Sequence, residues 1–372
     1  MTQENNQPPP SSPFPSAEPS ATLWGSARCY EETLVCNERS EAYARETRMA
    51  DVLKKFLKRW RDNYYLSSLL AHSLKPLRRV SSHTARNIQQ TVRKNGVTIR
   101  LPNGKKLSIA RDSGIATASL LFWHGIDGHE PETSRTLRFF FERASTFIDV
   151  GANCGLYSVL CALWNADIRV IAFEPVPAIF SALRKNVALN HVENRVRCEN
   201  MALSSRTGRA TLFLPVSETM DPETTGTLVS DSWQHRKGSQ PLEIDAVRFD
   251  EYENRNPMRV DLIKIDVEDF EADVLDGMQQ TIRRDRPFIV CEVLPRLHRN
   301  QRTRKIVEAL NYQPYWITPT GHVRVPGFDT SRSHFTDFLL SPVSTSDVVL
   351  DKLDVLWDLR KAELGNQEDK LA

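Results

Sequence analysis

A short turn bracketed by two glycines is the part of the sequence best suited to hold a ligand. Gly151 and Gly155 stand between the strand-like run 146–150 and an apolar helix start. Glycine lets the backbone turn sharply and lets a ligand approach it, while the first N–H groups of the following helix face an anion. Glu174 ends the next strand-like run, where its carboxylate can accept both hydroxyl hydrogens of a ribose. We therefore predict a site for a nucleoside-type cofactor; the alternative is a structural loop with a solvated glutamate.

Further carboxylates follow other strand-like runs. Asp266 and Glu268 come after the run 261–265, and Glu292 comes after the run 287–291. Ligands of open α/β sheets bind outside the carboxyl ends of the strands, so these groups should converge on one crevice with the glycine turn. In an extended segment Asp266 and Glu268 would point the same way. The structural alternatives are a helix N-cap for either residue and an ion pair with an arginine for Glu292.

The elements that must position these groups alternate regularly. We expect helices over 156–164, 177–190, 270–283 and 300–311, and strands over 146–150, 169–173, 195–199, 261–265 and 287–291. This alternation argues for an α/β fold with a doubly wound, mostly parallel sheet. A β-hairpin around Pro102-Asn103-Gly104 and a helix over 133–143 should precede the sheet, and edge strands near 315–317 and 338–340 should follow it.

Two surface segments are candidates for substrate contacts. The stretch from Gly128 to Glu132 is rich in His and Glu, which suits either a substrate-binding loop or an ordinary one. A long insertion over about 204–258 contains the Ser- and Thr-rich loop 217–233, where we expect acceptor selectivity, with a mobile surface loop as the alternative.

Composition describes a globular protein. The chain has 372 residues, 40% hydrophobic and 26% charged, with a net charge of +2. It has no long apolar run and no signal-peptide pattern, so we expect a cytoplasmic protein. The six cysteines form no CxxC pair, so neither a disulfide framework nor a metal site is predicted. We divide the chain into a disordered Pro- and Ser-rich tail (1–25), a basic, largely helical extension (26–95), the main domain (96–345) and a C-terminal helix or tail (346–372).

The basic residues are concentrated near the N-terminus. Residues 54–111 hold 15 Lys and Arg and a single acid, Asp62. A solvated helix face is one explanation, and peripheral contact with an anionic membrane or a phosphate-bearing acceptor is another. No nucleic-acid motif accompanies the charge, so we expect no nucleic-acid partner.

Several motifs in the same order resemble the FkbM family of S-adenosylmethionine-dependent O-methyltransferases. They are F-I-D-V-G-A-N-C-G-L-Y-S, F-E-P, L-R-K-N-V-A-L-N, N-M-A-L-S, D-L-I-K-I-D-V-E and R-P-F-I-V-C-E, spread over about residues 97–320. The resemblance implies a class I, Rossmann-like methyltransferase domain and an acceptor hydroxyl on a sugar, glycan or related natural product. One residue departs from the family: Asp269 stands where a glycine is usual, and Asp tolerates a positive φ better than most residues.

The cofactor that the resemblance implies, S-adenosyl-L-methionine, fits the candidate residues. Its ribose suits Glu174, its adenine can lie over Met201 and Ala202, and its ammonium suits Asp149 or Asp266. The full set of expected cofactor-binding residues is Asp149, Gly151, Ala152, Asn153, Gly155, Glu174, Pro175, Met201, Ala202 and Asp266.

The expected reaction is direct methyl transfer to an acceptor oxygen, dominated by positioning and assisted by a general base. Asp266, Glu268 and Glu292 are the candidate bases, with His129 behind them. Two alternatives stay open: a non-catalytic binding protein with the methyltransferase fold at a membrane surface, and an NAD-dependent oxidoreductase, which the missing third glycine disfavours.

Overall fold

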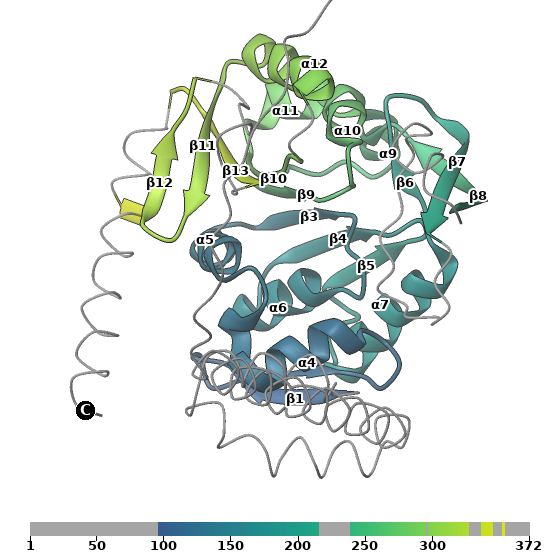
Figure 1. Cartoon of the computed structure of the whole chain (residues 1–372), viewed down its shortest axis with the longest axis vertical. Helices are drawn as coiled ribbons and strands as arrows, with labels where there is room; N and C mark the ends of the chain where they lie inside the picture. Colours follow the sequence, from purple (N-terminus) through teal and green to yellow (C-terminus); the bar gives the residue numbers. More distant parts are fainter. Residues whose placement is uncertain (1–95, 216–238, 295–296, 327–335, 345–351, 354–372) are drawn as a thin grey trace, which may run out of the picture. The chain divides into compact units, whose positions relative to one another are not determined.

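The strand-like runs of the sequence form the centre of one mixed sheet in the computed structural model (Figure 1). The structure describes residues 96–215, 239–294, 297–326, 336–344 and 352–353. The expected N-terminal segments 1–25 and 26–95, the loop 217–233 and most of 346–372 lie outside the described residues, so those predictions stay untested.

The main sheet has eight strands in the order β12-β11-β13-β10-β9-β3-β4-β5. Their bounds are β3 (Thr146–Val150), β4 (Arg169–Phe173), β5 (Val196–Glu199), β9 (Leu262–Ile265), β10 (Phe288–Glu292), β11 (Tyr312–Thr318), β12 (Gly321–Arg324) and β13 (Asp337–Pro342). The five strands from β10 to β5 are parallel, whereas β13 is antiparallel to both of its neighbours. This confirms the expected mostly parallel α/β sheet. The chain leaves β3 toward β4 on one side and later returns to β9 on the other, so the strand order reverses next to β3.

Helices cover both faces of this sheet (Figure 1). One face carries α4 (Ile115–His124), α5 (Pro131–Phe141), α6 (Leu156–Trp164) and α7 (Pro177–Leu189). The other face carries α9 (Phe249–Arg255), α10 (Glu271–Gly277), α11 (Gln279–Asp285) and α12 (Leu297–Ala309).

Among the residues that the structure describes, no helix is both long and apolar enough to cross a membrane.

Alternate residues of the central strands enter two separate cores, because successive side chains of a strand point to opposite faces. Phe147, Val170 and Leu262 pack under α5, α6 and α7. Ile148, Ile171 and Ile263 pack under α9 to α12. The near-continuous apolar sequence of these strands is what burial on both faces requires.

Two smaller sheets flank the main one. The predicted hairpin is present as β1 (Val97–Arg100) and β2 (Lys106–Ile109), with Gly104 at φ 82° in its turn. The insertion forms a sheet of β6 (Ala202–Leu203), β7 (Gly208–Pro215) and β8 (Ser239–Val247). Asn186 on α7 joins the hairpin to the glycine turn: its side chain accepts from the backbone N–H of Ala110 (2.7 Å) and donates to the backbone carbonyl of Cys154 (2.8 Å).

Three sequence-based expectations differ from the structure. The predicted edge strand near 338–340 is wrong, since β13 lies between β10 and β11, which explains why Phe338, Leu339 and Leu340 are all fully buried. The run 315–317 is not at the edge either, because β12 pairs with the outer side of β11. The expected helix 270–283 is two helices, α10 and α11. Gly277 ends the first where the backbone passes so close to Ser204 that a Cβ would lie 2.0 Å from the Ser204 carbonyl oxygen. The sequence pattern also did not predict α4 and α9.

Candidate functional site

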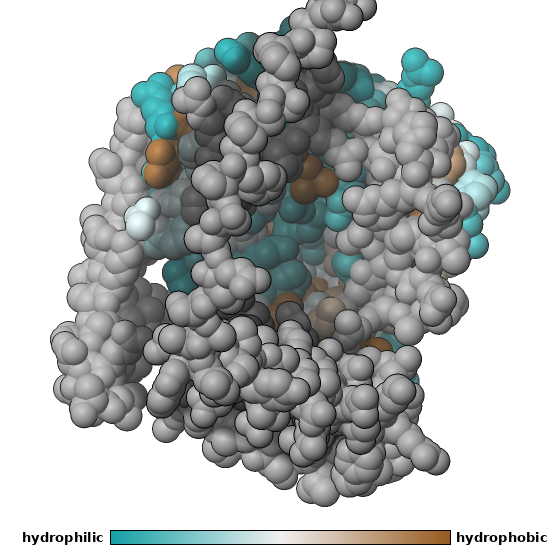
Figure 2. Space-filling model, in the orientation of Figure 1, coloured by the Kyte–Doolittle hydropathy of each residue, from teal (hydrophilic) through white to brown (hydrophobic). Residues whose placement is uncertain are grey.

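A cleft of about 710 Å³ opens at the carboxyl ends of β3, β4 and β9, next to the point where the strand order reverses. Figure 2 shows this face hollowed near its centre, with mostly hydrophilic atoms visible there. Of the residues predicted to bind a cofactor or act in catalysis, the cleft is lined by Gly151, Asn153, Glu174, Pro175, Met201, Ala202, Asp266 and Glu268. Its apolar wall includes Ile179, Leu203, Leu212, Val267 and Phe270. The cleft thus combines an apolar wall with three carboxyl groups, an arrangement typical of small-molecule sites.

The glycine turn owes its shape to residues that can adopt a left-handed backbone. Gly151, Asn153 and Gly155 have φ values of 76°, 51° and 86°. The N–H groups of Gly151 and Ala152 both donate to the carbonyl of Phe173, at 3.0 and 2.9 Å, which ties the turn to the end of β4. A Cβ on Gly151 would lie 1.9 Å from the carbonyl oxygen of Asp266, so only glycine fits where β3 meets the end of β9.

Glu174 anchors the turn as well as lining the cleft. Its carboxylate accepts the N–H of Asn153 (3.0 Å) and the N–H of Val176 (2.9 Å). The sequence predicted that N–H groups near the helix start face an anion; for the N–H of Asn153, that anion is the carboxylate of Glu174. Burial raises the pKa of Glu174 to about 7. Each carboxylate oxygen retains a second acceptor position, so the contacts with the turn leave room for ribose hydroxyl groups.

Three of the predicted cofactor-binding residues do not line the cleft. Asp149 lies inside β3, 1% exposed, and accepts a hydrogen bond from the hydroxyl of Ser158 at 2.5 Å. Asp149 points to the α6 face of the sheet because the side-chain alternation of β3 places it there, so it stabilises the start of α6 instead of facing the ligand. Ala152 is buried, and Gly155 begins α6 against Leu183, where a Cβ would meet the leucine at 2.4 Å.

The segment after β9 bends at Glu268 and Asp269, so the expectation that Asp266 and Glu268 point the same way along an extended segment is wrong. Glu268 and Asp269 have φ values of 49° and 77°. The buried carboxylate of Glu271 accepts the N–H of Asp269 at 3.0 Å and closes the turn, and burial raises the pKa of Glu271 to about 8. A positive φ suits glycine best, and Asp tolerates it better than most other residues, so Asp269 can take the place of the glycine that the resemblance led us to expect. Both Asp266 and Glu268 still line the cleft.

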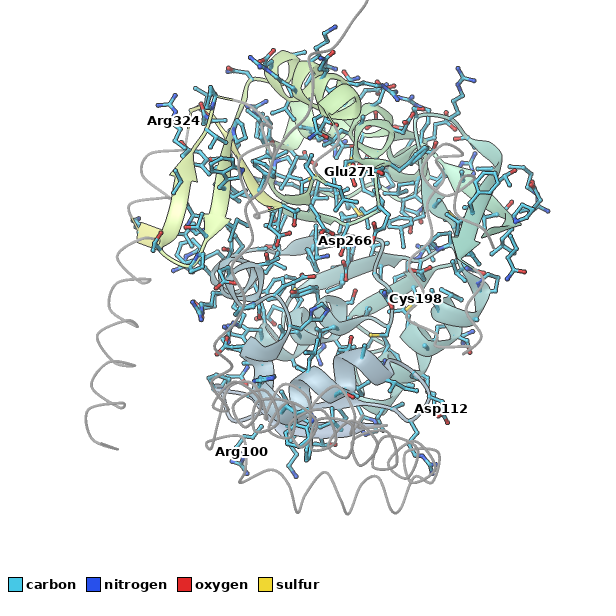
Figure 3. All side chains as sticks on the ribbon, viewed as in Figure 1. Arg100, Asp112, Cys198, Asp266, Glu271 and Arg324 are labelled. Atoms are coloured by element: carbon cyan, nitrogen blue, oxygen red, sulfur yellow. The ribbon has the colours of Figure 1, made fainter. Side chains whose placement is uncertain are left out.

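Asp266 is held by two side chains from neighbouring strands. The ammonium of Lys264 donates to Asp266 Oδ2 at 2.7 Å, and Glu292 on β10 forms a side-chain hydrogen bond with the same carboxylate. Burial alone would raise the pKa of Asp266, but Lys264 and these hydrogen bonds outweigh it and lower the pKa below its ordinary value. Burial and the charge of Asp266 raise the pKa of Glu292 to about 10. Figure 3 shows Asp266 near the centre of the view, with Glu271 above it.

The raised pKa of Glu292 favours its protonated form and so argues against a role as general base, which stays a prediction. The alternative of an ion pair with an arginine is not seen among the residues that the structure describes: there the carboxyl group of Glu292 contacts Asp266 and accepts the hydroxyl of Thr336 at 3.3 Å. A protonated carboxyl group donates one hydrogen bond, and here the acceptor is Asp266.

The N-terminus of α5 brings further polar groups to this end of the sheet. Glu130 has a left-handed backbone (φ 42°), and its carboxylate accepts the hydroxyl of Tyr157 at 2.9 Å. His129 lies 3.7 Å from Glu130 and is among the groups whose charge lowers the pKa of Asp266. Asp337, which pairs with Glu292 across β13 and β10, accepts the hydroxyl of Thr133 at 2.8 Å. Burial, together with the charge of Glu130, raises the pKa of Asp337 to about 7.

Sequence analysis overlooked Lys264, Tyr157 and Asp337. Lys264 had a detectable signal, because a lysine inside the buried run L-I-K-I must have an anionic partner. Tyr157 and Asp337 had none, since their partners lie 27 residues away at Glu130 and 204 residues away at Thr133. Within the described part of the chain, no three His, Cys, Asp or Glu side chains are placed to hold a metal ion.

Comparison with known proteins gives a family for this region. Residues 149–314 match the family described as the methyltransferase FkbM domain. This range contains the glycine turn, Glu174 and the strands β9 and β10 with their carboxylates.

Curated relatives are distant and are matched over part of their length. The chain is 29% identical over 155 residues to methyltransferase sdnD of Sordaria araneosa, which covers 36% of this chain and 60% of that protein. It is 26% identical over 211 residues to 31-O-demethyl-FK506 methyltransferase FkbM of Streptomyces tacrolimicus, which covers 49% and 75%. Thus the chain spans about three fifths of sdnD. Among solved structures, methyltransferase FkbM of Methylobacillus flagellatus KT has a TM-score of 0.35 and 14% identity, over 63% of this chain and 56% of that one.

Proposed function

We propose that the protein, whose residues 149–314 match the methyltransferase FkbM domain, transfers a methyl group from S-adenosyl-L-methionine to a hydroxyl group. The acceptor that we propose is a small molecule or a glycan. The observation that carries the proposal is the single cleft that Gly151, Glu174, Met201 and Asp266 line together.

The dimensions of the cleft fit the three parts of the cofactor. Glu174, at the end of β4, would accept the ribose hydroxyls, and the neighbouring apolar wall of Ile179, Ala202 and Leu212 suits the adenine ring. Asp266 lies at the end of β9, two strands away from β4, which at about 4.8 Å per strand is roughly 10 Å. That separation suits the methionine end of the cofactor, whose ammonium would meet Asp266.

Two of the candidate bases are already engaged. Asp266 accepts hydrogen bonds from Lys264 and Glu292, and the raised pKa of Glu292 favours its protonated form. Of the two candidates that remain, Glu268 and His129, we propose that His129 takes the proton, because imidazole is the side chain most often used as a general base; Glu130 lies 3.7 Å from its ring. When bound, the cofactor supplies the methyl group, and the protein supplies position and proton removal.

The test has a binding part and an activity part. Calorimetry with S-adenosylhomocysteine should show binding to the full-length chain and a clear loss of affinity in Glu174→Ala. Incubation of the chain with isotopically labelled S-adenosylmethionine and small-molecule or glycan extracts should give products heavier by a methyl group. Cofactor binding without any labelled product would favour the non-catalytic binding protein, and no binding would refute the proposal.

A further inference from the structure

The buried side chain of Lys264 and the partly buried one of Glu292 converge on Asp266, although neither lines the cleft. Lys264 is 5% exposed, and its ammonium lies 2.7 Å from Asp266 and 5.0 Å from the centre of the Tyr157 ring. Its backbone pairs with Asp149 on β3, so β3 brings a second buried carboxyl group beside it. Glu292 reaches the same carboxylate from β10, on the other side of β9.

The contacts fix both the direction and the charge of Asp266. A buried carboxylate without partners would take up a proton or turn away, because desolvation penalises its charged form. The ammonium of Lys264 and the hydrogen bond with Glu292 instead favour the ionised form of Asp266 and fix the direction of its carboxylate beside the cleft. Other charged or titratable groups packed near this pair are Asp149, His129, Glu130, Tyr157 and Asp337.

We propose that Lys264 and Glu292 are positioning residues: together they hold the Asp266 carboxylate where the ammonium of the cofactor's methionine end binds. The inference rests on the proposed function, since it assigns a role toward S-adenosylmethionine. A hydrogen bond between two carboxyl groups needs one proton between them, so Glu292 acts here as a donor to Asp266 and not as a base.

The test compares two ligands on the full-length chain by calorimetry. S-adenosylhomocysteine carries the ammonium, whereas methylthioadenosine lacks the whole amino acid end. Glu292→Gln keeps a hydrogen-bond donor without a charge, so it should bind S-adenosylhomocysteine within about threefold of the parent chain. Glu292→Leu removes the donor and should bind it about tenfold more weakly. Both variants should bind methylthioadenosine like the parent chain.

Lys264 gives a second pair of variants. Lys264→Arg keeps a cation and should weaken S-adenosylhomocysteine binding less than Lys264→Met does, again with no effect on methylthioadenosine. Glu253→Gln is the matched control, because Glu253 is a buried carboxylate whose partners are Arg284 and the N–H of Met258, and it does not line the cleft. It should leave the binding of both ligands unchanged.

The possible outcomes separate the inference from its premise. If Glu292→Leu equals Glu292→Gln, or if affinity for methylthioadenosine falls as much as affinity for S-adenosylhomocysteine, the positioning role is wrong. If the parent chain binds neither ligand, the proposed function itself fails. Should Glu292→Leu not fold, Glu292→Asp replaces it: its side chain is one methylene shorter, which should break the hydrogen bond with Asp266, and the same tenfold loss is expected.

Discussion

The two halves of the site are held together by different kinds of contact. In the half formed by β3 and β4, most contacts involve the backbone: two N–H groups of the glycine turn donate to the Phe173 carbonyl, and the Glu174 carboxylate accepts two more backbone N–H groups. In the half formed by β9, β10 and β13, side chains from distant segments meet one another. Here Lys264, Asp266, Glu292 and Asp337 share one polar layer on the α5 side of the sheet.

Because of this difference, the two halves should tolerate different substitutions. The half made of backbone contacts depends on φ angles and on the absence of side-chain atoms, so one added carbon atom can disrupt its structure. The half made of side-chain contacts depends on charges that balance one another. A substitution there should change pKa values and ligand affinity more than it changes the fold. We therefore expect substitutions in the first half to affect folding and cofactor binding together, and substitutions in the second half to separate them.

The largest effect is expected for Gly151→Ala. The new Cβ would lie 1.9 Å from the carbonyl oxygen of Asp266 at a residue with φ 76°, which should lower the free energy of unfolding by about 3 kcal/mol or more and abolish cofactor binding. The matched control is Gly104→Ala, with φ 82° and no atom within 4 Å of the new carbon. It should lose only about 1 kcal/mol and keep full affinity. Denaturant unfolding and calorimetry measure both quantities, and equal losses in the two variants would contradict the steric explanation.

The next largest effect is expected for His129→Ala, on the rate alone. Removal of a general base should reduce kcat about 100-fold, while S-adenosylhomocysteine affinity stays within about twofold because His129 does not line the cleft. Single-turnover kinetics with the acceptor found by mass spectrometry measures the rate. An unchanged rate would remove His129 from the mechanism without affecting the cofactor assignment.

Glu174→Ala should have a smaller effect that combines binding and stability. Loss of the carboxylate removes the ribose contact and also the hydrogen bonds to Asn153 and Val176. We expect cofactor affinity to fall by about 1–3 kcal/mol, and thermal unfolding to occur at a lower temperature even without ligand. Full affinity with reduced stability would mean that Glu174 only anchors the turn.

The smallest effect concerns the pH dependence of stability. The pKa of Asp337 rises from 3.8 to about 7 on folding, chiefly through burial, so the folded state holds a proton that the unfolded state releases between these values. The stability from this group is complete below about pH 4 and is lost as the pH rises through 7. Asp337→Asn has no such proton to lose. Between pH 4 and 7 the free energy of unfolding of this variant should therefore fall less steeply with pH than that of the parent chain, and the two slopes should differ by up to about 1.4 kcal/mol per pH unit. Urea titrations across this range check it, and an unchanged slope would refute the raised pKa.

The central sheet could be predicted from the sequence because its strands are buried on both faces. The run R-V-I-A-F, over Arg169–Phe173, is short, apolar and followed by Glu-Pro, which favours a buried strand over a helix. The helix over Leu156–Trp164 was predicted with the bounds that the structure has. The strand order at the far edge could not be predicted. Whether β13 lies outside or inside β11 depends on pairings between distant segments, which a local pattern does not record.

The candidate site divides in the same way. Gly151, Asn153 and Glu174 were found because a turn, a helix start and a strand end leave local signals. The partnership of Asp266 with Glu292, and that of Tyr157 with Glu130, depends on which strands and helices become neighbours. Asp149 was misplaced because its position next to the turn suggested a ligand, whereas the alternation of β3 sends its side chain to the other face of the sheet.

The close approach of Gly151 to the carbonyl of Asp266 has a mechanical consequence. Because no side chain separates the two backbones, the glycine turn and the segment after β9 are in direct backbone contact, so we expect a shift of one of them to be passed on to the other. Any adjustment of the protein to ligands of different size then falls to the opposite, apolar wall that β6 and β7 contribute through Leu203 and Leu212.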